Sequence, residues 1–144
     1  MYDINGDAAR AFANRRRQGG ISCTISHSVG EDVNMANIVV TATWARSLLL
    51  RLEMLSPGMH ITTLGPDSPG KVELGCDVLE AATLVCDDVA WARSMGCLSV
   101  WPQHDIRAIT LGAVLRDEVP GRQGSHVSRF LPRLACRFKI WLPH

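Results

Sequence analysis

Three short runs rich in β-branched residues, separated by stretches with helical features, constrain the fold of this chain more than any other feature. The runs are residues 38–40, 61–64 and 83–86. The continuous apolar run at 38–40 is typical of a strand buried on both faces of a sheet. Strands that alternate with helices are joined by crossover connections, which make neighbouring strands parallel. The sequence therefore predicts an α/β fold built on a parallel sheet with flanking helices.

Capping residues and periodicity predict the remaining elements. Asn5 is a good N-cap for a helix that ends near Gly19 and Gly20, and further helices are expected over residues 28–35 and 77–82. Two more strands are predicted, over residues 1–4 and 21–25.

The loop after residues 61–64 holds an acid between two prolines. The β-branched run stops at Gly65, and Asp67 follows with Pro66 and Pro69 on either side. Proline fixes its own φ and biases the residue before it toward an extended backbone, so this loop is stiffened. A catalytic acid is often held in this way. A solvated turn after a strand is the other interpretation of the same residues.

The segment HITTLGPDSPGKVEL, residues 60–74, resembles the signature of the ornithine cyclodeaminase/mu-crystallin family. In that signature a glycine, a variable residue, an aspartate and a second variable residue precede Pro-Gly-Lys and an acidic-Leu pair. The likeness continues through YDINGDAARAFA, ANIVVTATWAR, LRLEMLSPGMHI, DVLEAATLVCDD and LGAVLRDEVPGR. It implies a partial Rossmann-type NAD-binding domain over residues 1–125, without the first strand and the glycine-rich turn.

The resemblance also implies an activity. Family members convert L-ornithine to L-proline and ammonia, with NAD taking a hydride from the substrate and returning it to a cyclic imine. Asp67 matches the family's general acid/base, which moves protons between the substrate amines and water. Three alternatives stay open: a related imine reductase, an amino-acid dehydrogenase of the same family, and a non-catalytic remnant of the mu-crystallin type.

Cofactor contacts are implied at strand ends and in the loops that follow them. An acid at the end of a strand, as at Asp3, hydrogen-bonds the adenosine ribose and favours NAD over NADP, although an exposed turn acid is the alternative. Thr62 departs from the family pattern, because some relatives have Asn there. The implied cofactor-binding residues are Asp3, Thr43, Ile61, Thr62, Thr63, Leu64 and Lys71.

Much of the family's length has no counterpart in the sequence. No G-x-G-x-x-G motif occurs in it, and that motif holds the pyrophosphate of a dinucleotide. Family members are homodimers more than twice this long, and their substrate-binding and dimerising domain is absent here. We therefore expect a truncated fragment with impaired activity.

The likeness also stops near Phe130, so residues 126–144 are expected to be a tail foreign to the family. The segment LPRLACRFKIWLPH is cationic and aromatic. A change of reading frame near Phe130 is one hypothesis for its origin, and such a tail would not have been selected for packing.

Composition excludes several classes of function. The net charge of +1 argues against binding to nucleic acid or to an anionic membrane. No apolar run approaches the roughly 18 residues that span a bilayer, so a cytoplasmic protein is expected. The five cysteines lack a C-x-x-C pair and the five histidines are dispersed, which predicts neither a disulfide framework nor a metal site.

Overall fold

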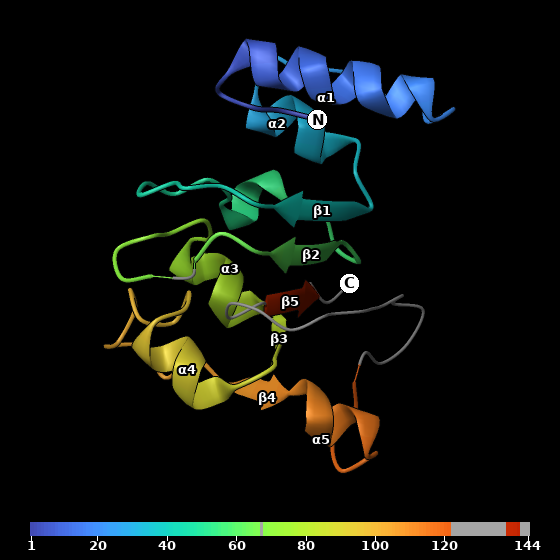
Figure 1. Ribbon diagram of the computed structural model, residues 1–144. Coiled ribbons are helices and arrows are strands. Elements are labelled where there is room, and N and C mark those ends of the chain that lie inside the picture. The colour runs from blue at the N-terminus through green and yellow to red at the C-terminus, as the bar shows by residue number, and fades with distance from the viewer. Residues whose placement is uncertain (67, 122–137, 142–144) are drawn as a thin grey trace. The chain divides into compact units, whose positions relative to one another are not determined.

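The computed structural model comprises two compact units, Met1–Ala36 and Asn37–His144. The described residues are 1–66, 68–121 and 138–141. Helices and strands alternate through most of the chain (Figure 1). None of the helices among the described residues has the length and apolar character needed to cross a membrane.

The first unit contains two capped helices, and both were predicted. The Asn5 side chain accepts hydrogen bonds from two backbone N–H groups of the first turn of α1 (Gly6–Gln18). The Ser28 hydroxyl caps α2 (Val29–Asn34) in the same way. These side chains satisfy N–H groups that have no partner within a helix, which explains where each helix begins.

Residues 1–4 and 21–25 do not form the strands that their sequence predicts. They meet at one point, where the terminal ammonium of Met1 donates to the Thr24 carbonyl at 2.7 Å. The Ser26 N–H donates to the Met1 carbonyl at 2.9 Å. Two such bonds are the repeating step of a parallel ladder, but a strand needs several steps in succession.

The second unit is built on a five-stranded sheet in the order β1-β2-β5-β3-β4. β1 runs parallel to β2, and β3 runs parallel to β4, whereas β5 is antiparallel to both of its neighbours. The α/β class with parallel strands is thus confirmed, and the antiparallel strand is an addition. The strands are β1 (Ile38–Thr41), β2 (His60–Thr63), β3 (Thr83–Cys86), β4 (Ala108–Thr110) and β5 (Phe138–Trp141).

β5 comes from the segment that was expected to be a tail without a packing role. It pairs with β2 on one side and with β3 on the other, so that Ile140 lies opposite both Ile61 and Leu84. Two interior strands would otherwise leave their backbone N–H and C=O groups without ladder partners, and β5 supplies partners to both.

Short helices connect the strands. The predicted helix at 77–82 is observed one residue earlier, as α3 (Cys76–Ala81). α4 (Val89–Ser94) and α5 (Leu111–Leu115) were not predicted, and the side chains of Asp88 and Thr110 cap them. A single 3-10 turn, η1 (Leu52–Met54), precedes β2.

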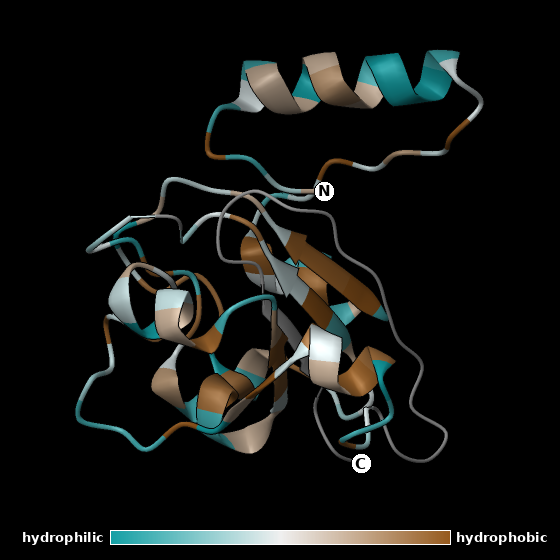
Figure 2. Ribbon diagram, turned by 60° about the horizontal axis from the view of Figure 1, so that its bottom comes forward, coloured by the Kyte–Doolittle hydropathy of each residue, from teal (hydrophilic) through white to brown (hydrophobic). Residues whose placement is uncertain are grey.

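The core of the second unit consists of aliphatic side chains from the sheet and from the segments beside it. In Figure 2 hydrophobic residues colour much of the sheet brown. Burial of each large aliphatic side chain contributes about 1.5–3 kcal/mol. Those with at most 1% of their surface exposed are Leu50, Ile61, Leu74, Val78, Leu79, Leu84 and Val85.

Candidate functional site at the carboxyl edge of β1 and β2

β1 and β2 end together at one edge of the sheet. They are parallel and in register, with Thr41 opposite Thr63 at their last positions. The Leu64 N–H continues the pairing by donating to the Thr41 carbonyl at 2.8 Å. The loop that carries the predicted catalytic residue begins here. Asp67 itself lies outside the described residues.

A buried carboxylate joins the segments that meet at this edge. Glu73 exposes 1% of its surface. Its Oε2 accepts from the Thr41 hydroxyl at 2.6 Å and from the Gly65 N–H at 3.3 Å. Its Oε1 accepts from both the hydroxyl and the N–H of Thr43, each at 2.7 Å. One side chain thus ties β1, the residues after β1 and the turn after β2 to one another.

Gly65 is required by the close approach of this carboxylate. A Cβ at this position would lie close to Glu73 Oε1 and to the Thr43 carbonyl oxygen, well inside any normal contact distance. No side chain fits there without moving the carboxylate or the backbone. The glycine of the family signature therefore has a packing reason in this chain.

A buried cation lies on the same segment. Lys71 is 6% exposed, and its Nζ is 3.9 Å from the centroid of the Trp44 ring, within the range of a cation–π interaction. The Val72 N–H donates to the Ala45 carbonyl, so this segment runs beside the chain that follows β1. Gly70 has φ of +79°, a left-handed conformation that glycine adopts at little cost.

The predicted cofactor-binding residues occupy different environments. The Thr43 hydroxyl is engaged by Glu73, and Ile61 is fully buried in the core. Thr62 is half-buried, with its hydroxyl 3.1 Å from His60 Nε2. Thr63 is fully buried, and its hydroxyl has no hydrogen-bond partner among the described residues.

Asp3 belongs to the other compact unit, Met1–Ala36. It is exposed, and its Oδ1 accepts from the Asn5 N–H at 2.8 Å just before α1. This contact turns the chain into the helix, and it uses one of the two carboxylate oxygens.

Glu73 is the site residue that sequence reasoning missed, since it was noted only as the acid of the family signature. One signal in the sequence points to it. An acid between Val72 and Leu74, with threonines at 41 and 43 just after the strand predicted over residues 38–40, has the hydroxyl partners that a buried carboxylate needs.

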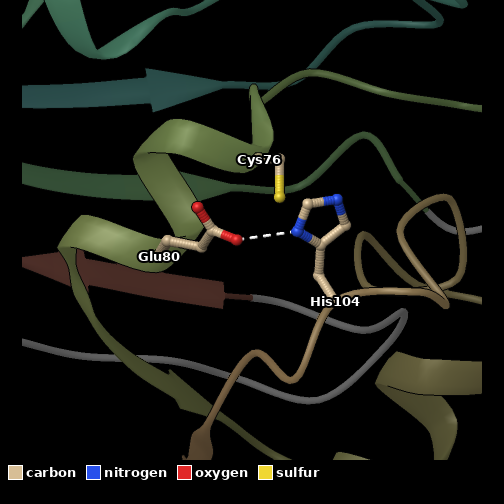
Figure 3. Close-up of side chains that lie close together, drawn as sticks. All are labelled: Cys76, Glu80 and His104. Atoms are coloured by element: carbon tan, nitrogen blue, oxygen red, sulfur yellow. Dashed lines mark hydrogen bonds and ion pairs between the residues drawn. The ribbon is translucent and has the colours of Figure 1, made fainter.

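A second cluster lies at the start of α3, where the side chains of Cys76, Glu80 and His104 point toward one another (Figure 3). Their ligand atoms all lie within 4.8 Å of one another, and His104 Nδ1 is 2.7 Å from Glu80 Oε1. Burial, and then the hydrogen bond and charge of Glu80, raise the pKa of the Cys76 thiol to about 11. The hydrogen bond to His104 lowers the pKa of Glu80. Sequence analysis predicted no metal site, because nothing in the sequence relates His104 to residues more than 20 positions earlier.

Comparison with known proteins settles the family. The model of the ornithine cyclodeaminase/mu-crystallin family matches residues 1–127. The chain belongs to this family. The resemblance found in residues 60–74 is thereby confirmed.

Relatives with several activities are similar to this family member. The alanine dehydrogenase of Archaeoglobus fulgidus is 29% identical over 127 residues, which are 85% of this chain and 39% of that protein. The ornithine cyclodeaminase of Brucella melitensis is 29% identical over 125 residues, covering 85% of this chain and 34% of the relative. The iminosuccinate reductase of Paracoccus denitrificans is 34% identical over 104 residues, covering 66% of this chain and 31% of the relative.

A solved structure confirms the fold. An archaeal alanine dehydrogenase dimer with bound NAD matches with a TM-score of 0.73 and 27% identity, over 87% of this chain and 40% of that one. The chain thus spans less than half the length of the relatives it matches.

Proposed function

We propose that this chain forms part of the cofactor site of an NAD-dependent enzyme that converts L-ornithine to L-proline and ammonia. The observation that carries the proposal is the edge at which β1 and β2 end in register and are tied together by Glu73. Ligands of open α/β sheets bind at the carboxyl ends of parallel strands. The loop with Asp67 leaves from this edge.

The residues at this edge suit the nicotinamide side of a dinucleotide. The Lys71 ammonium offers a cation for a ribose or phosphate oxygen, and the Thr63 hydroxyl is a buried polar group without a described partner. Thr43, Ile61, Thr62 and Leu64 complete the proposed cofactor contacts on this side, and Asp3 is proposed for the adenosine ribose. NAD, when bound, supplies hydride transfer to and from the substrate carbon. Asp67 is proposed to move protons between the substrate amines and water.

The pyrophosphate of the cofactor needs a different element. A glycine-rich turn at a helix N-terminus normally holds it, and the sequence contains no G-x-G-x-x-G. We therefore expect the residues on the nicotinamide side to supply most of the affinity of this chain for NAD.

Titration calorimetry with NAD tests the cofactor site. We expect a dissociation constant in the micromolar range for the chain, and weaker binding by Lys71→Met, which removes the ammonium. Arg51→Met is the matched control, because Arg51 is exposed and lies outside the proposed site. An absence of heat, or equal affinities for the two variants, contradicts the proposal.

The fate of the hydride separates the proposed ornithine activity from the dehydrogenase and imine reductase alternatives. Cyclodeamination of L-ornithine returns the hydride, so proline and ammonia form without net NADH. Oxidation of L-alanine accumulates NADH, and reduction of a cyclic imine consumes it. Product analysis with these three substrates therefore distinguishes the ornithine activity from the dehydrogenase and reductase alternatives. Binding of NAD without any turnover favours the non-catalytic alternative. The sequence predicts impaired activity for this chain, and Asp67→Asn should keep NAD binding and abolish whatever turnover the chain shows.

A further inference from the structure

The start of α3 and a loop downstream of it bring together the sulfur, nitrogen and oxygen donors of a zinc site. Cys76 and Glu80 are four residues apart on α3, so their side chains lie on one face of the helix. The start of the helix is fixed from outside, because the Leu52 N–H donates to Asp77 Oδ2 at 3.0 Å. The Gly75 N–H also donates to the Leu50 carbonyl at 2.9 Å.

The third donor is held toward the first two by its own loop. The His104 N–H donates to the Trp101 carbonyl at 3.1 Å. The rings of Trp101 and His104 meet edge to face, with centroids 6.0 Å apart and an interplanar angle of 89°. Nδ1 of His104 thus faces α3 and reaches Glu80 Oε1 at 2.7 Å. A ring fixed by its surroundings keeps the ligand nitrogen in place, as metal-binding histidines require.

The separations fit one small ion after a minor adjustment. Ligand atoms that bind zinc tetrahedrally at about 2.0–2.3 Å lie roughly 3.3–3.8 Å from one another. The three ligand atoms here lie within 4.8 Å of one another. The nitrogen and oxygen ligands belong at the short end of that range, so the 2.7 Å contact between Glu80 and His104 has to lengthen by roughly 0.6 Å. Side-chain rotation allows this because Glu80 is half exposed.

We propose that Cys76, Glu80 and His104 bind one Zn²⁺ ion, with water as the fourth ligand. The Cys76 thiol releases its proton to solvent when it binds the ion. The resulting thiolate, an imidazole and a carboxylate form the mixed donor set that zinc accepts, and harder ions such as Mg²⁺ and Ca²⁺ prefer oxygen alone. The partial exposure of Glu80 and His104 gives the ion a path from solvent. The bound ion clamps α3 to the loop at residues 101–104, and its open position leaves room for an exogenous ligand.

Cobalt is the probe, because Co²⁺ takes zinc sites and a bound thiolate gives it a charge-transfer absorption. The background variant is Cys23→Ser with Cys136→Ser. Among the described cysteines this leaves Cys76 as the accessible thiol, since Cys86 and Cys97 are buried. We expect the absorption to saturate at one equivalent of Co²⁺ and to disappear when Zn²⁺ is added.

Variants of the three ligands decide the assignment. Cys76→Ser in the same background should lose the charge-transfer band. Glu80→Gln and His104→Ala should each weaken Co²⁺ binding by about tenfold or more. Glu53→Gln and His27→Ala are the matched controls, because both residues are exposed and lie outside the cluster.

Three results overturn the proposal: no band in the background variant, a band that survives Cys76→Ser, or equal affinities in ligand and control variants. Circular dichroism identifies a variant that fails to fold. Should Cys76→Ser fail, Glu80→Gln still decides, since it replaces an exposed side chain.

Discussion

The Glu73 carboxylate lies inside the protein and accepts hydrogen bonds from two hydroxyls and two backbone N–H groups. A buried charge is costly unless polar partners replace its water. Here the partners come from two segments of the chain, residues 41–43 at the end of β1 and just after it, and Gly65 after β2. The cost of burial is therefore offset only when the edge of β1 and β2 is assembled.

Replacement of this acid should destabilise the second unit. In Glu73→Gln one acceptor oxygen becomes an NH₂ donor that faces the donors of Thr43 or of Thr41 and Gly65. We expect a loss of about 2–4 kcal/mol in the free energy of unfolding, since hydrogen bonds to a charged group contribute about 1.5–3 kcal/mol each. Urea denaturation measures it. The exposed Glu53→Gln should change stability by less than about 0.5 kcal/mol, and an equally small change for Glu73→Gln contradicts the assignment.

A buried thiol makes the free energy of unfolding depend on pH in the alkaline range. Burial, followed by the charges of Asp87 and Asp88, raises the pKa of Cys86 from 9.0 to about 12. The folded state thus holds a proton that the unfolded state releases near pH 9. The stabilisation is complete below pH 9 and is lost as pH rises toward 12.

This dependence can be measured by urea denaturation between pH 8 and about 10.5. Above pH 9 the parent chain should lose up to about 1.4 kcal/mol per pH unit through this proton. Cys86→Ala should reduce the slope by up to about half, because Cys76, whose pKa is raised to about 11, contributes a similar dependence. Cys23→Ala, which removes a half-buried thiol of the first unit, should keep it. Identical slopes for the two variants would show that Cys86 does not titrate as described.

The difference between Asp67 and Glu73 shows how far the sequence predicts the site. Asp67 draws attention because prolines flank it, which is a local pattern. The importance of Glu73 arises from contacts with Thr41, Thr43 and Gly65, up to 32 positions away. The sequence offers donors for such a carboxylate, but these contacts become visible only after β1 and β2 are placed side by side. The same holds for Cys76 and His104.

At the scale of elements, the stability of α1 depends on the side chain of its N-cap, Asn5. Asn5 Oδ1 accepts from the N–H groups of Asp7 and Ala8 at 3.0 and 3.1 Å. Asn5→Ala should destabilise the helix by about 1 kcal/mol. Asn14→Ala should do the opposite, because Asn14 lies inside the helix and alanine has the higher helix propensity. Amide hydrogen exchange in α1 measures both changes, and exchange in Asn5→Ala that is no faster than in the parent chain would exclude the capping role.

Elements with a strong local signal were predicted, and elements that depend on distant partners were not. β1, β2 and β3 follow from β-branched runs, and α1 and α2 follow from their caps. The expected strands at residues 1–4 and 21–25 were wrong, since apolar alternation alone does not provide neighbours for a ladder. α4 and α5 contain six and five residues, which is too short for periodicity to identify a helix.

At the scale of the whole molecule, the sheet includes a strand that lies beyond the segment matched by the family. The match ends at residue 127, yet β5 (Phe138–Trp141) lies between β2 and β3. The two parallel pairs, β1 with β2 and β3 with β4, therefore belong to one sheet through a strand from outside the matched segment. The hypothesis of an out-of-frame tail predicts that removal of the last residues leaves stability unchanged. The observed sheet predicts that their removal destabilises the second unit.

A chain that ends at residue 137 should lose its cooperative unfolding transition. This chain lacks β5, so four residues of β2 and four of β3 lose their pairing with that strand. Each lost backbone hydrogen bond costs about 0.5–1.5 kcal/mol, and the total is comparable with the 5–15 kcal/mol that stabilises a typical domain. A chain that ends at residue 141 keeps β5 and is the matched control. Urea denaturation followed by tryptophan fluorescence compares the two, and equal midpoints would show that the tail adds nothing to the sheet, as an unselected tail would.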